Sequence, residues 1–216
     1  MNEQPMINQT EQQPNGTPEK DPRRPLSVVI FEYVELFAWS VFIVMVTFTF
    51  LFRICRVDGH SMENTLKENQ MLLLRSAFYT PKQDDIVVFH LTDPAHGLEK
   101  TLVKRVIAVG GQEVVIDTNT NTITVDGVVY EDTHKVLKDR STGVITNTYS
   151  TYGLFFDHFD TQTGIFHATV PEGSIFVMGD NRNNSRDSRN PDVGFVDERC
   201  VLGGVMLRLS PFTVFR

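Results

Sequence analysis

The stretch LSVVIFEYVELFAWSVFIVMVTFTFLF, from Leu26 to Phe52, decides how this chain is organised. Its only ionisable side chains are Glu32, Tyr33 and Glu35, all in its first half. As an α-helix rising about 1.5 Å per residue, it would extend roughly 40 Å, more than a hydrocarbon core of about 30 Å. We therefore predict a single transmembrane helix over residues 26–52, with both glutamates near an interface.

Two other interpretations of this stretch are weaker. A cleavable signal peptide would not begin after a long polar tail, and a small-x-small cleavage site would follow it. A buried core helix would need helical partners, whereas the residues after Phe52 predict strands. Charge does not orient the helix, because basic residues lie on both sides of it. These are Lys20, Arg23 and Arg24 before it and Arg53, Arg56 and Lys67 after it.

Composition restricts the remaining possibilities. Residues 1–25 are rich in Gln, Asn, Glu and Pro and predict a disordered tail, because they have little to bury. The net charge of -7 and the scattered basic residues argue against a nucleic-acid partner. Two cysteines define neither a disulfide framework nor a metal site. We expect Cys200 to be a small core residue, while Cys55, beside the helix, leaves acylation open.

Short β-rich runs separated by turn residues follow the helix and predict a mainly β, antiparallel core. Asp126-Gly127 lies between two such runs and predicts a two-residue hairpin. The core would comprise residues 53–130 and 169–216. Residues 131–168, with weaker periodicity, predict an inserted arm or small subdomain. The predicted strands are Met71–Leu74, Ile86–Leu91, Leu102–Val109, Glu113–Asp117, Thr122–Val125, Val128–Tyr130, Ser174–Met178 and Val201–Leu209.

A serine and a lysine in two separate motifs suggest chemistry. Ser61, in VDGHSM, lies in a loop shortly after the predicted anchor, although a serine after Gly-X is by itself usually a turn residue. Lys104 interrupts the apolar run TLVKRVIAV. In an alternating strand Lys104 and Arg105 face opposite sides, so one of them would point inward; a lysine protecting a sheet edge is the ordinary alternative.

A buried lysine would be useful to a serine. At an ordinary pKa near 10.4, only about one lysine in 2,500 is neutral at pH 7. Burial among apolar side chains disfavours the ammonium and lowers the pKa. The neutral amine could then take the serine proton and return it to the leaving group. The two residues therefore support one interpretation, a serine nucleophile with a lysine base.

The motif GDNRNNSRDSR, residues 179–189, is a dense polar loop. It fails the EF-hand calcium pattern, since Arg182 and Arg186 fall where a ligand or glycine is required. We interpret it as a hydrogen-bonded floor, in which Asp187 pairs with Arg189 or Arg182 and a serine hydroxyl holds the amine of Lys104.

The anchor followed by GHSM, DIVVF, KRVIAVGG and GDNRNNSRDSR, in this order, resembles the bacterial type I signal peptidases (leader peptidases). These are Ser-Lys dyad serine endopeptidases with a β-rich catalytic core and no metal or cofactor. They remove N-terminal signal peptides from exported preproteins after small-x-small sites. The resemblance implies a single-pass protein of the cell membrane with a cytoplasmic N-terminus, residues 53–216 on the extracytoplasmic side, and proximity to the secretion translocon.

The resemblance also implies roles for individual residues. Ser61 would be the nucleophile, Lys104 the general base and Ser185 a hydrogen-bond partner of the lysine. Asp187 and Arg189 would form a structural ion pair. The loop behind the dyad would be shaped by Gly179, Asp180 and Asn181.

Three positions depart from the family pattern. Asn64 replaces a common proline, and Asp84 replaces a glycine before the DIVVF run. Gly59 stands where some relatives have an oxyanion-binding hydroxyl, so the oxyanion hole around Gly59 would depend on backbone donors such as the Ser61 N–H.

Substrate would bind as an added strand between Val57–Ser61 and Asp85–Val88. Val57, Ile86 and Val103 are candidates for its shallow apolar pockets, although each would serve equally well in a core. The 71–74 run and two C-terminal aromatic residues, Phe212 and Phe215, are core candidates that could also contact lipid.

Three other functions are considered. A self-cleaving repressor of the LexA type would carry a helix-turn-helix where this chain has its apolar stretch. A membrane-tethered binding protein would not need the set of Ser61, Lys104, Ser185 and Asp187. A Ser-His-Asp hydrolase would need a histidine in a recognisable motif, and none of the histidines lies in one. They are His60, His90, His96, His134, His158 and His167.

Overall fold

The computed structural model describes residues 25–93, 98–138, 142–146 and 158–215. Helix α1, Leu26–Phe50, is apolar along its length, buries no side chain and is long enough to cross a membrane. The chain divides into two units, Met1–Ile43 and Val44–Arg216. The prediction of an N-terminal apolar helix that could span a membrane is therefore confirmed. The predicted tail, apart from Pro25, lies outside the described residues.

An 8-stranded sheet forms the first part of the second unit. It has the order β1-β2-β12-β3-β4-β10-β11, with β13 paired to β12, and its pairings are antiparallel. The mainly antiparallel β fold predicted from the sequence is thus confirmed. The strands are β1 Phe52–Arg56, β2 Met71–Arg75, β3 Ile86–Asp93, β4 Leu98–Val109, β10 Ser174–Met178, β11 Val196–Asp197, β12 Val201–Leu209 and β13 Phe212–Val214.

Strands β1 and β4 run in the same direction, because each neighbouring pair along β1-β2-β12-β3-β4 is antiparallel. Both strands also have an unpaired edge. β1 pairs only with β2, and β10 pairs with β4 only from Arg105 to Val109, so Glu99–Lys104 pairs on one side alone within the described strands. These two free edges border the candidate site.

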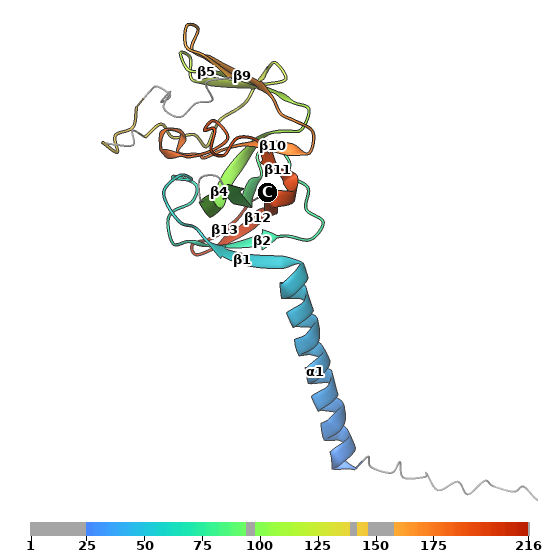
Figure 1. The fold of residues 1–216 in the computed structure, drawn as a ribbon. Helices are drawn as coiled ribbons and strands as arrows, with labels where there is room; N and C mark the ends of the chain where they lie inside the picture. Colours follow the sequence, from blue (N-terminus) through green and yellow to red (C-terminus); the bar gives the residue numbers. More distant parts are fainter. Residues whose placement is uncertain (1–24, 94–97, 139–141, 147–157, 216) are drawn as a thin grey trace, which may run out of the picture. The chain divides into compact units, whose positions relative to one another are not determined.

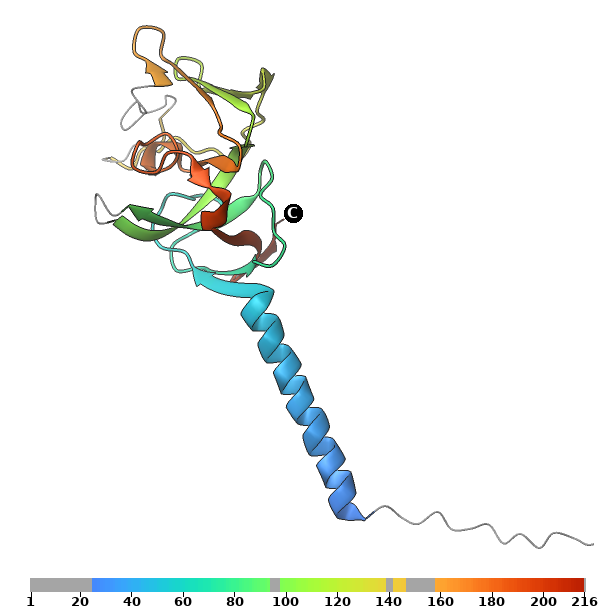
Figure 2. The ribbon, with the colours of Figure 1, turned by 45° about the vertical axis from the view of Figure 1, so that its right-hand side comes forward.

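A 5-stranded sheet in the order β7-β6-β5-β9-β8 forms a second layer, reached from β4 through the turn after Val109 (Figures 1 and 2). Asp126-Gly127 joins β6 to β7, with both residues at positive φ (51° and 76°), as the predicted hairpin requires. The strands are β5 Glu113–Asp117, β6 Thr122–Val125, β7 Val128–Val129, β8 Phe159–Asp160 and β9 Ile165–Thr169.

Strand β9 lies almost entirely inside the segment predicted as an arm. It pairs with β5 along the whole of Glu113–Asp117, which the sequence did not indicate. The arm over 131–168 stays a prediction as a separate unit, and residues 139–141 and 147–157 of it lie outside the described residues.

Apolar side chains join the two sheets. Ile107 on β4 and Phe176 on β10 belong to the same buried cluster as Ile116 and Phe166 of the second sheet. A second cluster, with Val57, Met62 and Leu74, fills the region beneath β1 and β2. The expectation for Cys200 is wrong. Its side chain is exposed, because it ends the 3-10 helix Glu198–Cys200 just before β12 enters the sheet.

Candidate active site

Ser61 and Lys104 meet at the free edges of β1 and β4. Ser61 follows β1 in a turn, and Lys104 lies on β4 with 2% of its surface exposed. The Lys104 Nζ donates a hydrogen bond to Ser61 Oγ at 2.7 Å and another to the Val103 carbonyl at 2.9 Å. One of Lys104 and Arg105 was predicted to point inward; both are buried, and the Lys104 amine is directed at the serine hydroxyl.

Burial sets the protonation of this amine. It lowers the pKa of Lys104 from 10.5 to about 8, although the carboxylates of Asp187 and Asp180 act in the opposite direction. With a pKa near 8, roughly a tenth of the lysine is neutral at pH 7. The neutral amine has a lone pair that can accept the Ser61 proton, so the pair has the geometry and the proton affinity of a base and a nucleophile.

Arg105, the next residue on β4, turns to the other side of the strand and is also buried. Its guanidinium donates two hydrogen bonds to the Asp180 carboxylate, at 2.9 and 2.8 Å. Thr65 Oγ1 donates to the same carboxylate at 2.5 Å. The Asp180–Arg105 pair therefore fixes the start of the polar loop against the strand that carries the lysine.

The polar loop returns to the dyad through Asn181. The Asn181 N–H donates to the Ser61 carbonyl at 3.0 Å, and Asn181 Nδ2 donates to the His60 carbonyl at 3.1 Å. These two bonds hold the peptide group before Ser61 and the peptide group after it. Asn181 is thus positioned to fix the orientation of the nucleophile.

Asp187 pairs with Arg189 rather than with Arg182. The Arg189 guanidinium donates to both Asp187 oxygens, at 2.8 and 2.9 Å, and the Gly179 N–H donates to one of them at 3.0 Å. Burial alone would raise the pKa of Asp187, but Arg189 holds it below its ordinary value. Both side chains are buried, and the Asp187 carboxylate stays ionised near the lysine.

Gly179 lies where the loop is packed most closely against the dyad. A Cβ there would lie 2.5 Å from the Ser61 carbonyl oxygen and would overlap the Ser185 hydroxyl. Only glycine lets these groups approach each other. The buried Ser185 hydroxyl makes no hydrogen bond of good geometry within the described residues, although it contributes to the lowered pKa of Asp187. Its bond to the lysine stays a prediction.

The surroundings of Gly59 are open. It has a φ of +85°, and no atom lies within 4 Å of the position of an added Cβ. The Ser61 N–H makes no hydrogen bond to the backbone of the described residues. The N–H is therefore free to face a developing oxyanion, while the role of Gly59 stays a prediction.

A cleft of about 490 Å³ separates the end of β1 from the free edge of β4. Val57 and Val103 line it together with both dyad residues, whereas Ile86 lines a different cavity. The structure thus places β4, from Glu99 to Lys104, opposite β1, where the sequence had placed Asp85–Val88. The cause is the sheet order, because β3 is paired on both sides.

Other residues that the sequence singled out also have defined surroundings. Cys55 lines the cleft, and burial raises the pKa of its thiol to about 11, so it is a poor nucleophile at neutral pH. The His60 ring contacts Glu63 at 2.8 Å, and the hydrogen bond to Ser61 Oγ comes from Lys104. Among the described residues, no group of three or more His, Cys, Asp or Glu side chains is placed to hold a metal.

The sequence missed one ion pair, Asp132 with Arg182. Both side chains are buried, and the guanidinium meets the carboxylate at 2.5 and 2.7 Å while donating to the Gly179 carbonyl at 2.9 Å. Val136 pairs with Asn181 in a parallel bridge beside it. The motif itself suggested two partners for Asp187, but nothing local indicated that Asp132 would take Arg182.

A buried lysine hydrogen-bonded to a serine beside an open cleft is an arrangement that can activate a serine nucleophile, as hydrolases of the acyl-transfer class require. The family model of signal peptidase, peptidase S26, matches residues 30–210. The chain therefore belongs to the signal peptidase (peptidase S26) family.

Individual relatives carry related names. The chain is 30% identical to the probable signal peptidase I-1 of Synechocystis sp. over 72% of this chain and 69% of the relative. It is 28% identical to signal peptidase IB of Staphylococcus aureus, over 87% and 93% of the two chains. A crystal structure of a signal peptidase I from Enterococcus faecalis is 28% identical, with a TM-score of 0.38, covering 59% of this chain and 98% of that one.

Proposed function

We propose that this chain is a membrane-bound serine endopeptidase that removes N-terminal signal peptides from exported preproteins after small-x-small sites. The observation that carries the proposal is the 2.7 Å hydrogen bond between Ser61 Oγ and the buried Lys104 amine. The family and its named relatives supply the substrate class.

The reaction starts with Lys104 as the neutral amine. Ser61 Oγ attacks the scissile carbonyl carbon while its proton passes to Lys104 Nζ, giving a tetrahedral oxyanion and an ammonium. The oxyanion accepts a hydrogen bond from the Ser61 N–H. The ammonium then protonates the amine of the mature protein, which leaves an acyl-enzyme with the signal peptide. Water, deprotonated by the same lysine, hydrolyses this ester and restores Ser61.

The polar loop supports this reaction from behind. Asn181 holds the backbone of Ser61, and the Asp187 carboxylate, paired with Arg189, acts on the pKa of the lysine. Ser185 would turn its hydroxyl to the Lys104 amine when the proton moves. We assign these residues to positioning, because their contacts are with the dyad and its loop.

Substrate enters the cleft as an extended strand. The free edges of β1 and β4 run in the same direction on its two sides, so a peptide placed between them can hydrogen-bond to both. Its carbonyl reaches Ser61 at the end of both strands. Val57 and Val103 lie in this cleft, and their apolar surfaces suit the small residues before the cut.

The membrane part of the proposal rests on α1. It would cross the bilayer once, with the N-terminus in the cytoplasm and residues 53–216 outside, where the signal peptides of exported chains emerge. The end of α1 at Phe50 would leave the active site tethered to the membrane that holds its substrates.

The test uses the full chain in detergent with a preprotein that carries a small-x-small site. We expect wild type to cut after that site and Ser61→Ala and Lys104→Ala to be inactive while remaining folded. The matched control is Lys67→Ala, which removes an exposed lysine near the nucleophile and should cut at the wild-type rate. Wild-type cleavage by either dyad variant, or none by wild type, would reject the proposal.

A further inference from the structure

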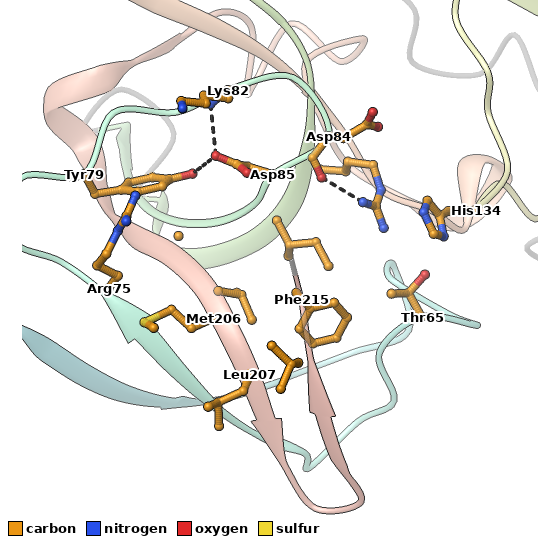
Figure 3. A pocket seen from close by; sticks show the side chains of 15 residues that line it. Thr65, Arg75, Tyr79, Lys82, Asp84, Asp85, His134, Met206, Leu207 and Phe215 are labelled. Atoms are coloured by element: carbon orange, nitrogen blue, oxygen red, sulfur yellow. Dashed lines mark hydrogen bonds between the residues drawn. The ribbon is translucent and has the colours of Figure 1, made fainter.

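A second cavity, of about 580 Å³, lies among β2, β3, β12 and β13, outside the catalytic cleft (Figure 3). Its floor is apolar and includes Met206, Leu207 and Phe215. Its polar side carries Arg75, Tyr79 and other charged groups, namely Lys82, Asp84, Asp85 and Arg105. Neither the reaction nor the substrate strand uses this cavity.

Two cations line the cavity without an ion-pair partner among the described residues. They are Arg75 and Lys82. Arg75 lies over the ring of Tyr79, with its guanidinium carbon 5.4 Å from the ring centre. This stacking orients the guanidinium while leaving its N–H groups free to donate. A planar guanidinium held in this way favours a phosphate, which can accept two of those N–H bonds.

The other charged groups of the cavity have partners. The Asp180 carboxylate neutralises Arg105, and Asp84 accepts a hydrogen bond from Tyr130. Asp85 accepts from the Tyr79 hydroxyl at 2.7 Å and from the Lys82 backbone N–H at 3.0 Å, and both donors are neutral. Asp84 also keeps its charge, because Tyr130 is a neutral donor, so Arg75 and Lys82 face two carboxylates across the cavity. The preference for an anion therefore rests on the oriented, unpaired guanidinium of Arg75 and not on an excess of positive charge.

Strand pairing places Arg75 close to the end of the membrane helix. α1 ends at Phe50, and Phe52 at the start of β1 pairs with Arg75. The Ser76 N–H also donates to the Leu51 carbonyl at 3.0 Å. If the chain leaves the bilayer at the end of α1, Arg75 lies opposite Phe52, two residues after that exit. This position corresponds to the level of the lipid headgroups.

Exposed apolar side chains accompany the cations. Phe212 and Val214 of β13 are 70% and 56% exposed, and Val214 also lines the cavity. The cavity thus combines a free, oriented guanidinium with an apolar floor open to an apolar rim. A phospholipid has this pattern, with one charged phosphodiester joined to acyl chains.

We propose that this cavity binds the headgroup of a membrane phospholipid, with Arg75 and Lys82 on the phosphodiester and the β12–β13 side chains against the glycerol and acyl chains. The inference rests on the membrane anchoring proposed above, but not on proteolysis. Its role would be to hold the catalytic unit against the bilayer at a fixed face.

The test measures lipid binding by the full chain after delipidation in neutral detergent. Native mass spectrometry follows the binding of phosphatidylglycerol, of diacylglycerol without a phosphate, and of inorganic phosphate. We expect phosphatidylglycerol to bind to wild type and to Ser61→Ala alike. Arg75→Gln should weaken this binding about fivefold, the usual effect of one cation at a membrane surface, and Lys82→Gln should do the same.

Arg53→Gln is the matched control, because Arg53 is an exposed arginine of β1 that does not line the cavity. It should change the affinity less than twofold. Equal losses in Arg53→Gln and Arg75→Gln would show general surface attraction and overturn the proposal, as would equal binding of diacylglycerol. Competition by inorganic phosphate at the same concentration would reassign the cavity to a free anion.

Failure of this inference can be separated from failure of the proposed function. Thermal unfolding of Arg75→Gln should match wild type, which excludes loss of the fold as the cause. Flotation of the full chain with liposomes reports anchoring by α1, and preprotein cleavage reports the dyad. An anchored, active chain that does not bind phosphatidylglycerol would overturn the cavity proposal alone.

Discussion

The two sides of β4 each bury one basic side chain, and the two surroundings have opposite effects on its pKa. On the cleft side, Lys104 is buried beside a hydroxyl and a carbonyl, and its pKa falls to about 8. On the other side, Arg105 is buried against a carboxylate that accepts two of its N–H bonds, and its charge is fully retained. Of these two neighbours, Lys104 is the one for which desolvation outweighs the nearby carboxylates, and it is the one that we propose to exchange a proton.

The largest expected effect comes from replacing Lys104 on the cleft side by arginine, the residue type found at position 105 on the other side. Lys104→Arg keeps a cation of similar length, but a guanidinium stays protonated at any working pH. We expect cleavage of a preprotein to fall by about a thousandfold or more, as when other proteases lose their base. An initial-rate assay measures the loss. Activity within tenfold of wild type would contradict the role of Lys104 as base.

Breaking the ion pair on the other side should cost stability instead. Arg105→Met leaves Asp180 buried with no cationic partner, a change that typically costs about 3–5 kcal/mol. Chemical denaturation of the full chain in detergent, followed by the unfolding of residues 53–216, measures this loss of stability. Arg199→Met is the control, since Arg199 pairs with Asp197 at the exposed surface, and it should leave the denaturation midpoint unchanged. Equal midpoints for the two variants would contradict the comparison.

Removing the uncompensated charge should stabilise the fold. The pKa of Lys104 is lower in the folded chain than in the unfolded one, so the unfolded chain binds more protons between about pH 8 and 10.5. The penalty is complete below pH 8 and disappears as the pH rises through this window. Lys104→Met should therefore be more stable than wild type at pH 7, by up to about 3 kcal/mol.

The same variant offers a control within itself, its pH dependence. At pH 10.5 the stability difference between Lys104→Met and wild type should be largely gone, because both are then neutral at this position. Denaturation at pH 7 and pH 10.5 tests this directly. A difference that does not change with pH would point to packing rather than to the lysine charge.

The smallest effect is expected on the pH dependence of cleavage. With neutral Lys104 as the proposed base, kcat/KM should rise with pH through a midpoint near pH 8 and level off about one unit higher. The Asp187 carboxylate holds this pKa up, so Asp187→Asn should move the midpoint to lower pH. Profiles of kcat/KM from pH 5 to 10 measure the shift. A midpoint that moves to higher pH would exclude this electrostatic role of Asp187.

Much of the fold followed from periodicity. The runs Glu113–Asp117, Thr122–Val125, Ser174–Met178 and Val201–Leu209 form strands with the predicted bounds. These runs alternate apolar and polar residues or are continuously apolar, and both patterns can be read directly from the sequence. Strand β9 was missed, because its pairing with β5 depends on residues distant in the chain.

The site shows the same division. The apolar run around Lys104 and Arg105 predicted that one of the two would point inward, and the structure buries both, one on each side of β4. The partner of Asp187 was left open between Arg182 and Arg189, since both lie nearby in the sequence. Arg182 is taken by Asp132, from a segment with no motif. The facing edge of the cleft was also misplaced, because sheet order decides which strand is left unpaired.

The free edges of β1 and β4 give the catalytic unit a sheet that lacks one strand, which the proposed substrate would supply. A polypeptide can fill that gap only where its own backbone N–H and C=O groups are not already bonded to one another. In the proposed complex the edges would therefore recognise the local backbone conformation of a segment as well as its side chains. A cleavage site would therefore be accepted only while its own segment is extended and unpaired, whatever the folding state of the rest of the chain.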